Sequence, residues 1–243
     1  MTKENLEAIK NKAIQLLYLD VEEDTSLSGI ASMTGMQSVI HPVFDKSPII
    51  QMDESRQPYV LDILHDKKAL EKAREIGKEH FSTCKDVEGV FWLIRKPWRL
   101  GFLKGIKKYL DNKEFSGLLG DIWVDVESPN MDGFVSEDVL LEWFQTADKT
   151  SLMSEEELET YNYLPDEVQI YRGVGTKSNP KGFSWTTNLE VAERFAERYS
   201  MLDGDGYIAV ATVKKEDVLA YFSRRDEDEY IVDGNKLDIH EME

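Results

Sequence analysis

The first two thirds of the chain space their apolar residues mainly as helices do. Intervals of three and four recur over 4–19, over the charged segment 66–81 and over 89–162, and this period predicts helices with one buried face. Between the first two, 25–60 is interrupted by glycine and proline, which predicts irregular structure with short strands. Ser154 and Glu157 have the spacing of a capping box, so a helix is expected to begin there.

The pattern changes at residue 165, where apolar and polar residues begin to alternate. Strands are predicted in LPDEVQIYRG, GFSWTT, DGDGYIAVATV and DEYIVD, and NLEVAERFAERY reads as one helix capped by Asn188. A helical part followed by strands with a single inserted helix predicts an α+β fold rather than regular βαβ units.

The domain organisation follows from the same pattern. A chain of 243 residues can form one large domain or two small ones. The break near 82–88 is the expected boundary between 1–85, a mostly helical region of unknown role, and 86–243. The second domain is expected to contain a helical part, 86–164, and a β-rich core, 165–243.

The charge balance limits the partners. The formal net charge is −18, and such a chain repels nucleic-acid backbones. One basic segment, 94–108, contains six Lys and Arg residues and no acid. It is interpreted as a helix face that offsets acids elsewhere in the fold, with a docking patch for an acidic partner or phosphates as the alternative.

Several other classes find no support in the sequence. The only cysteine, Cys84, and four scattered histidines give no zinc spacing, and no glycine-rich nucleotide loop occurs. No apolar run has the length of a membrane span, and the first 20 residues lack the features of a signal peptide. A cytoplasmic location is therefore expected.

Three short motifs after residue 165 could carry chemistry together. They are Tyr171-Arg172-Gly173 at a strand end, the Ser184-Trp-Thr-Thr strand, and Glu227-x-Glu229 before a Tyr-Ile-Val strand. Each has a plain alternative: an arginine in a salt bridge, a serine facing solvent, and a solvated acidic turn. Their order within one compact stretch favours a shared site.

This order resembles the mono-ADP-ribosyltransferases of the arginine–serine–glutamate class, which include bacterial toxins and phage enzymes. The resemblance covers about 165–240, and residues 1–85 lie outside it. It implies a fold of two small packed β-sheets with a cleft for NAD, which is a substrate here, and it implies no metal. The middle motif reads Ser-Trp-Thr rather than Ser-Thr-Ser, so no role passes to Thr186 or Thr187.

The resemblance also implies residue roles. Glu229 would stabilise the oxocarbenium-like sugar and Glu227 would orient or deprotonate the acceptor, with both side chains on one face of extended backbone. Ser184 would hold Glu229 in place. NAD itself would be bound by Arg172 at a phosphate, by Gly173 at the nicotinamide amide, and by the remaining candidates Tyr171, Ser184, Phe195 and Arg198. Phe195 is also explained as a core residue of the 188–199 helix.

The expected function is transfer of ADP-ribose from NAD to a protein arginine inside a bacterial host cell, by a chromosomal or phage enzyme. Hydrolysis of NAD by a glycohydrolase is the first alternative. A non-catalytic NAD-binding or protein-binding module with the same fold is the second. Modification of nucleic acid is disfavoured by the charge, and neither the acceptor nor an inhibitory partner can be named from the sequence.

Overall fold

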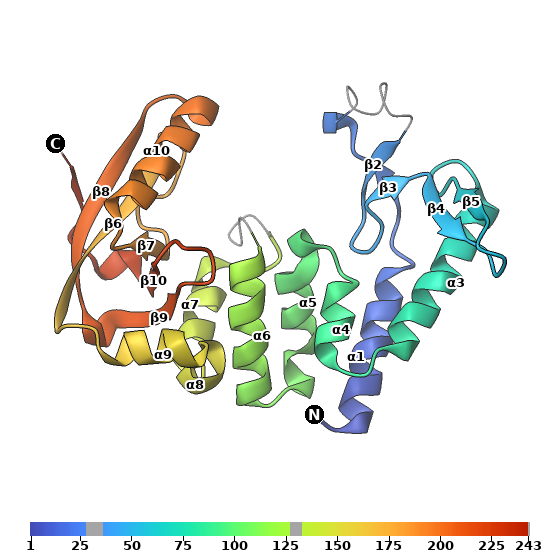
Figure 1. The fold of residues 1–243 in the computed structure, drawn as a ribbon, viewed down its shortest axis with the longest axis horizontal. Helices are drawn as coiled ribbons and strands as arrows, with labels where there is room; N and C mark the ends of the chain where they lie inside the picture. The colour runs from blue at the N-terminus through green and yellow to red at the C-terminus, as the bar shows by residue number, and fades with distance from the viewer. Residues whose placement is uncertain (28–35, 127–132, 243) are drawn as a thin grey trace. The chain divides into compact units, whose positions relative to one another are not determined.

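The computed structural model describes residues 1–27, 36–126 and 133–242, and Figure 1 gives the course of the chain. The chain forms two compact units. Unit 1 consists of Met1–Asp111 and Ser128–Val135, and unit 2 of Asn112–Glu127 and Ser136–Glu243. The division therefore comes after Asp111 and not near 82–88, because the helices that follow residue 86 pack on the first helix of the chain.

Unit 1 combines helices with short strands. The helices predicted at 4–19 and 66–81 are present, the second starting at an Asp66 side-chain cap. Short strands occupy 37–61 as expected, whereas part of the predicted irregular region, 28–35, lies outside the described residues. Together with the earlier strand β1, they form a three-stranded sheet, β1-β2-β3, and a hairpin, β4-β5. The elements are α1 (Lys3–Leu16), β1 (Glu22–Glu23), β2 (Gln37–Ile40), β3 (Lys46–Ser47), β4 (Ile49–Met52), β5 (Pro58–Leu61), α3 (Lys67–Thr83), α4 (Val87–Trp92) and α5 (Arg99–Ile106).

The basic segment 94–108 is partly used inside unit 1. Arg95 Nη1 donates to three backbone carbonyls, those of Val39, His41 and Phe44, at 2.6, 3.2 and 3.0 Å. Arg99 is buried and its Nε donates to the Ile94 carbonyl at 2.9 Å. Both arginines therefore use their side chains to bind backbone carbonyls within unit 1, which favours a structural interpretation of that part of the segment.

His41 is a buried titratable group at the base of the same loop. Its Nδ1 accepts from the backbone N–H groups of Val43 and Phe44, both at 3.1 Å, and its ring stacks on Phe44. Nε2 is buried and makes no hydrogen bond of good geometry in the described part of the chain. The nearby Leu16 carbonyl acts to raise the pKa of the ring, but other effects are larger. Burial, with Arg74 and Arg95 nearby, lowers the pKa of His41 to about 4. The ring is therefore neutral at pH 7.

His41 should make the folded chain less stable as the pH falls from about 6.5 to about 4. The unfolded chain binds the proton first, because the pKa of His41 is lower when folded. Allowing for screening, the loss is roughly 2 kcal/mol. His41→Asn should reduce this dependence, since its amide oxygen can accept from the same N–H groups without titrating. Urea unfolding of both proteins at pH 7 and pH 4.5 measures the difference, and equal losses in the two would contradict this assignment.

Unit 2 begins with four helices and continues with strands, as the sequence pattern predicts. The helices are α6 (Asn112–Asp125), α7 (Glu137–Thr146), α8 (Lys149–Leu152) and α9 (Glu155–Asn162). The later elements are β6 (Glu167–Gly175), β7 (Ser184–Thr186), α10 (Leu189–Asp203), β8 (Gly206–Lys214), β9 (Val218–Phe222), β10 (Glu229–Val232) and β11 (His240–Glu241). The capping box of Ser154 and Glu157 is present, and Asn188 caps α10. The mixed α+β class is confirmed.

The strands of unit 2 form one antiparallel six-stranded sheet of order β11-β8-β6-β7-β10-β9. This differs from the expected pair of separate packed sheets. β7 pairs with β10 on one side and meets β6 on the other through the single residue pair Tyr171 and Thr186. The narrow junction leaves two three-stranded halves, and the candidate motifs lie on the strands beside it.

Helix α10 covers β6 and β8 (Figure 1). Two glycines let the backbones approach closely. A Cβ on Gly173 would lie 2.4 Å from the Ala192 carbonyl oxygen, and one on Gly206 would lie 2.2 Å from that of Ala196. Gly173 is thus required by packing between β6 and α10, which a β-carbon would prevent.

No helix in the described ranges is long and apolar enough to cross a bilayer.

Candidate functional site

Glu229 is the centre of the candidate site. It is the first residue of β10 and lies opposite Thr186 of β7 and Phe222 of β9. Ser184 lies two residues before Thr186, so its side chain is a diagonal neighbour of Glu229 on one face of the sheet. The serine and the glutamate are 45 residues apart in the sequence. Pairing of β7 with β10 brings them together.

Two donors converge on one oxygen of the Glu229 carboxylate. The Ser184 hydroxyl donates to Oε1, as the resemblance implied. The Trp123 indole N–H, from α6, donates to the same oxygen at 3.1 Å. Oε2 accepts no hydrogen bond from any described residue, so it is the oxygen available to a ligand.

The electrostatic state of Glu229 reflects competing effects. Burial raises the pKa of its carboxyl group, and the charge of Glu227 raises it further. The hydrogen bonds from Ser184 and Trp123 lower it, as does the charge of Arg225. The two donors therefore favour an ionised carboxylate in a place where burial opposes the charge.

Glu227 does not continue the strand. β10 starts at Glu229, and the preceding residues Asp226 and Asp228 have positive φ angles of 55° and 44°. Left-handed residues on both sides bend the backbone, so the expected extended arrangement of Glu227 and Glu229 is wrong. Asp and Asn tolerate this conformation better than most residues.

The bend is nevertheless held firmly. The Thr186 hydroxyl donates to the Glu227 carbonyl at 2.7 Å, and the Tyr221 hydroxyl donates to Asp228 Oδ1 at 2.6 Å. The first of these contacts gives Thr186 a structural role, and the second shows that Asp228 is more than a solvated turn residue. The backbone of the bend, two positions before Glu229, is thus fixed by partners on β7 and β9.

Arg224 anchors the start of the same loop to the helices of unit 2. Its Nε lies 3.3 Å from the fully buried carboxylate of Glu157, and its Nη1 lies 2.5 Å from Asp121. Glu157 also accepts from the Ser223 backbone N–H at 3.0 Å and from its capping partner Ser154. Residues 223–229 therefore connect two helices with the strand that carries Glu229.

Arg172 brings an enclosed positive charge to this region. Its Nη1 donates to the Ser184 carbonyl at 2.6 Å, while its Nε is shut off from solvent and lacks a partner in the described part of the chain. A Cβ on Gly182 would lie 2.5 Å from Nη2, so that glycine leaves room for the guanidinium. Burial lowers the pKa of Arg172, and the Tyr199 and Glu229 charges oppose the change.

The salt bridge considered for Arg172 does not occur among the described residues. The guanidinium is enclosed, and it donates to a carbonyl instead of a carboxylate. An arginine remains protonated in such a place. This region therefore has a guanidinium suited to an anion, and it is close enough to Glu229 for the charge of that carboxylate to act on its pKa.

The other residues expected to bind NAD make no hydrogen bond to Ser184 or Glu229 in the described part of the chain. Tyr171 pairs with Thr186 across the sheet, and its hydroxyl donates to Gln169 at 2.9 Å. Phe195 lies on α10, where its Cβ would be 2.7 Å from a Cβ on Gly173, so packing accounts for it. Arg198 is exposed on the same helix and makes no hydrogen bond or ion pair with Arg172, Ser184 or Glu229.

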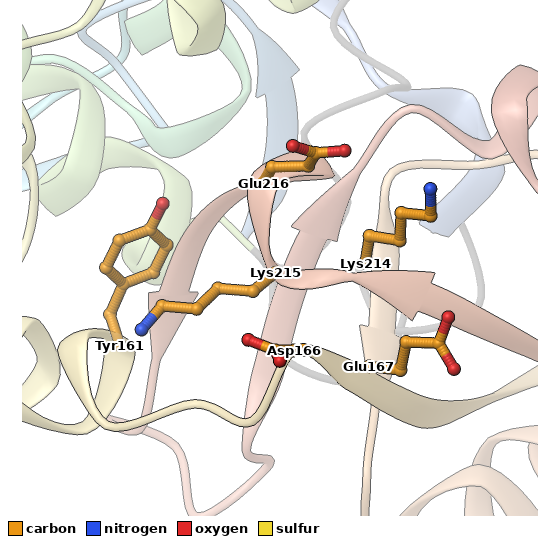
Figure 2. Close-up of a pocket in the computed structure, with 6 residues that line it drawn as sticks. All are labelled: Tyr161, Asp166, Glu167, Lys214, Lys215 and Glu216. Carbon is orange, nitrogen blue, oxygen red and sulfur yellow. The ribbon is translucent and has the colours of Figure 1, made fainter.

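A pocket of about 530 Å³ lies elsewhere in unit 2 (Figure 2). It lies between the end of α9 and the first residues of β6, where Glu167 pairs with Lys214 across the sheet. Lys215 donates there to the Asn162 carbonyl at 2.5 Å. Three acids and two lysines line it, and no candidate site residue does.

Trp123 is the site residue that the sequence did not indicate. It stands in the run GLLGDIWVD, where its spacing predicts only a core position, and it is indeed 3% exposed. Only the folded structure reveals that its N–H reaches Glu229.

Comparisons with protein-family models, with curated proteins and with solved structures find no match for this chain.

Proposed function

We propose that this chain is a mono-ADP-ribosyltransferase that cleaves NAD and transfers ADP-ribose to an arginine of a protein. The observation that carries the proposal is the group formed by Ser184, Glu229 and Arg172. The serine holds the carboxylate, and the arginine contacts the same serine through its backbone.

The chemistry of NAD cleavage suits these groups. Nicotinamide leaves with the electron pair of the glycosidic bond, and the ribose carbon becomes cationic. A carboxylate fixed beside that carbon stabilises the charge as it develops. The free Glu229 Oε2 provides such a carboxylate, and the enclosed Arg172 guanidinium provides a cation for the diphosphate.

The acceptor step assigns a role to Glu227. A guanidinium nitrogen of the acceptor attacks the ribose carbon and must lose a proton, which a nearby carboxylate can take. Glu227 is close enough to Glu229 for its charge to raise the pKa of that residue, and its backbone is fixed by Thr186.

Incubation of the protein with NAD labelled in the adenylate part, in a bacterial lysate, tests the proposal. Labelled protein bands that hydroxylamine removes are expected, since hydroxylamine cleaves ADP-ribosyl-arginine. Free ADP-ribose without labelled bands would instead identify a glycohydrolase. Intact NAD would overturn both enzymatic functions and leave the non-catalytic module.

Glu227→Ala should separate transfer from hydrolysis. Removing this carboxylate takes away the proton acceptor for the incoming arginine and leaves Glu229 and its two donors in place. Protein labelling should fall by about 100-fold, in the usual range for loss of a general base, while slow release of ADP-ribose continues. Both products are measured in one reaction, and an equal loss of the two would contradict this role.

A further inference from the structure

Trp123 makes a contact that the proposed triad of residues does not require. Its indole N–H donates to Glu229 Oε1 at 3.1 Å, although the two residues are 106 positions apart. The same oxygen accepts the Ser184 hydroxyl. The contact joins the helical part of unit 2 to the strand that carries the reactive carboxylate.

The Trp123 ring is held in one orientation. It packs edge to face on Phe144 of α7, with centroids 4.9 Å apart and planes at 90°, and it lies near Phe183 at 6.5 Å and 67°. The side chain is 3% exposed. Since the ring cannot rotate without breaking these core contacts, its N–H points at Glu229 in a fixed direction.

Two donors on one oxygen restrict a carboxylate more than a single donor does. A hydroxyl alone can follow the carboxylate as it turns, because the hydroxyl itself rotates. An indole N–H cannot follow, so it selects one rotation of the carboxyl group. Oε2 is then presented in a single direction without a partner among the described residues.

We propose that Trp123 is a positioning residue, which fixes the Glu229 carboxylate through Oε1 so that Oε2 faces the ribose of NAD. This inference rests on the proposed function. Trp123 contacts the catalytic carboxylate and not the substrate. It favours the ionised form of Glu229, as a hydrogen bond to a charged acceptor does.

Trp123→Phe tests the proposal, because phenylalanine keeps an aromatic ring in the core and removes the N–H. The kcat for NAD cleavage should fall about tenfold or more, the range for loss of a hydrogen bond to a charged group, with KM little changed. The acidic limb of the pH profile should move to higher pH, since Glu229 loses a donor that lowers its pKa.

The titration of Glu229 by NMR on ¹³C-glutamate-labelled protein, with the signal assigned from Glu229→Gln, gives a second readout without turnover. The pKa of Glu229 should be higher in Trp123→Phe than in the wild type. Trp143→Phe is the matched control, because Trp143 is equally buried in the same unit and packs on Phe115. It should leave the pKa of Glu229 unchanged.

The two readouts separate failure of this inference from failure of the proposed function. An active wild type, with the same Glu229 pKa and the same pH profile in both tryptophan variants, would overturn the role of Trp123 alone. A wild type inactive on NAD would overturn the proposed function and with it the catalytic role of Trp123. In that case a raised Glu229 pKa in Trp123→Phe would still establish the contact itself.

Discussion

Glu229→Gln is expected to lower the rate of NAD cleavage about 100-fold to 1,000-fold, the range found when an electrostatic stabiliser of a transition state is removed. The glutamine oxygen can still accept from Ser184 and Trp123, so the geometry of the site is retained. What is lost is the negative charge that the proposed function requires at the ribose. Transfer to protein and release of free ADP-ribose should therefore fall together.

The stability of this variant should not fall. Burial raises the pKa of Glu229, which means that the folded protein holds the charged form at a cost that glutamine does not incur. Asp226→Asn is the matched control, since it removes one negative charge from the exposed bend that precedes Glu229, and asparagine tolerates the positive φ of 55°. NAD consumption by Glu229→Gln at the wild-type rate would refute the assignment, provided that both variants unfold at similar temperatures.

Arg172→Met is expected to weaken NAD binding by about 100-fold, because it removes the enclosed cation while keeping an unbranched side chain of similar length. A charge-assisted contact to a phosphate contributes about 1.5–3 kcal/mol. The thermal midpoint should stay the same or rise. The buried guanidinium has no carboxylate partner among the described residues, so removing it relieves a desolvation cost that offsets the lost bond to the Ser184 carbonyl.

This pair of results would separate a ligand-binding arginine from a structural one. An arginine that serves only the fold would lower the midpoint when replaced and leave the affinity for NAD unchanged in the folded fraction. Arg194→Met supplies the comparison, since Arg194 is exposed on α10 and no role is assigned to it. Calorimetric titration with NAD and thermal unfolding on the same samples give both values.

Local pattern was sufficient for the class of fold and for most elements. The change from spacings of three and four to alternation near residue 165 predicted helices followed by strands, and the structure has that order. Caps were equally readable, as Ser154 with Glu157 and Asn188 demonstrate. These features depend on neighbours within four residues, so the sequence contains all the information they need.

Features that depend on non-local packing were predicted less well. The unit boundary came after Asp111 because α4 and α5 pack on α1. The expected two sheets are one, since a single residue pair joins β6 to β7. The prediction of extended backbone from Glu227 to Glu229 was wrong because Asp228 adopts a left-handed conformation. Hydrogen bonds from Tyr221 and Thr186 stabilise that bend.

The candidate site divides in the same way. The sequence by itself determined the residue types: a serine, a glutamate and an arginine in an order that resembles a known class of enzyme. Tertiary structure decided which of them meet, because the contact of Ser184 with Glu229 exists only when β7 pairs with β10. Tertiary structure alone showed that Trp123 donates to Glu229. A buried tryptophan on a helix looks the same in sequence whether its N–H faces a carbonyl or a carboxylate.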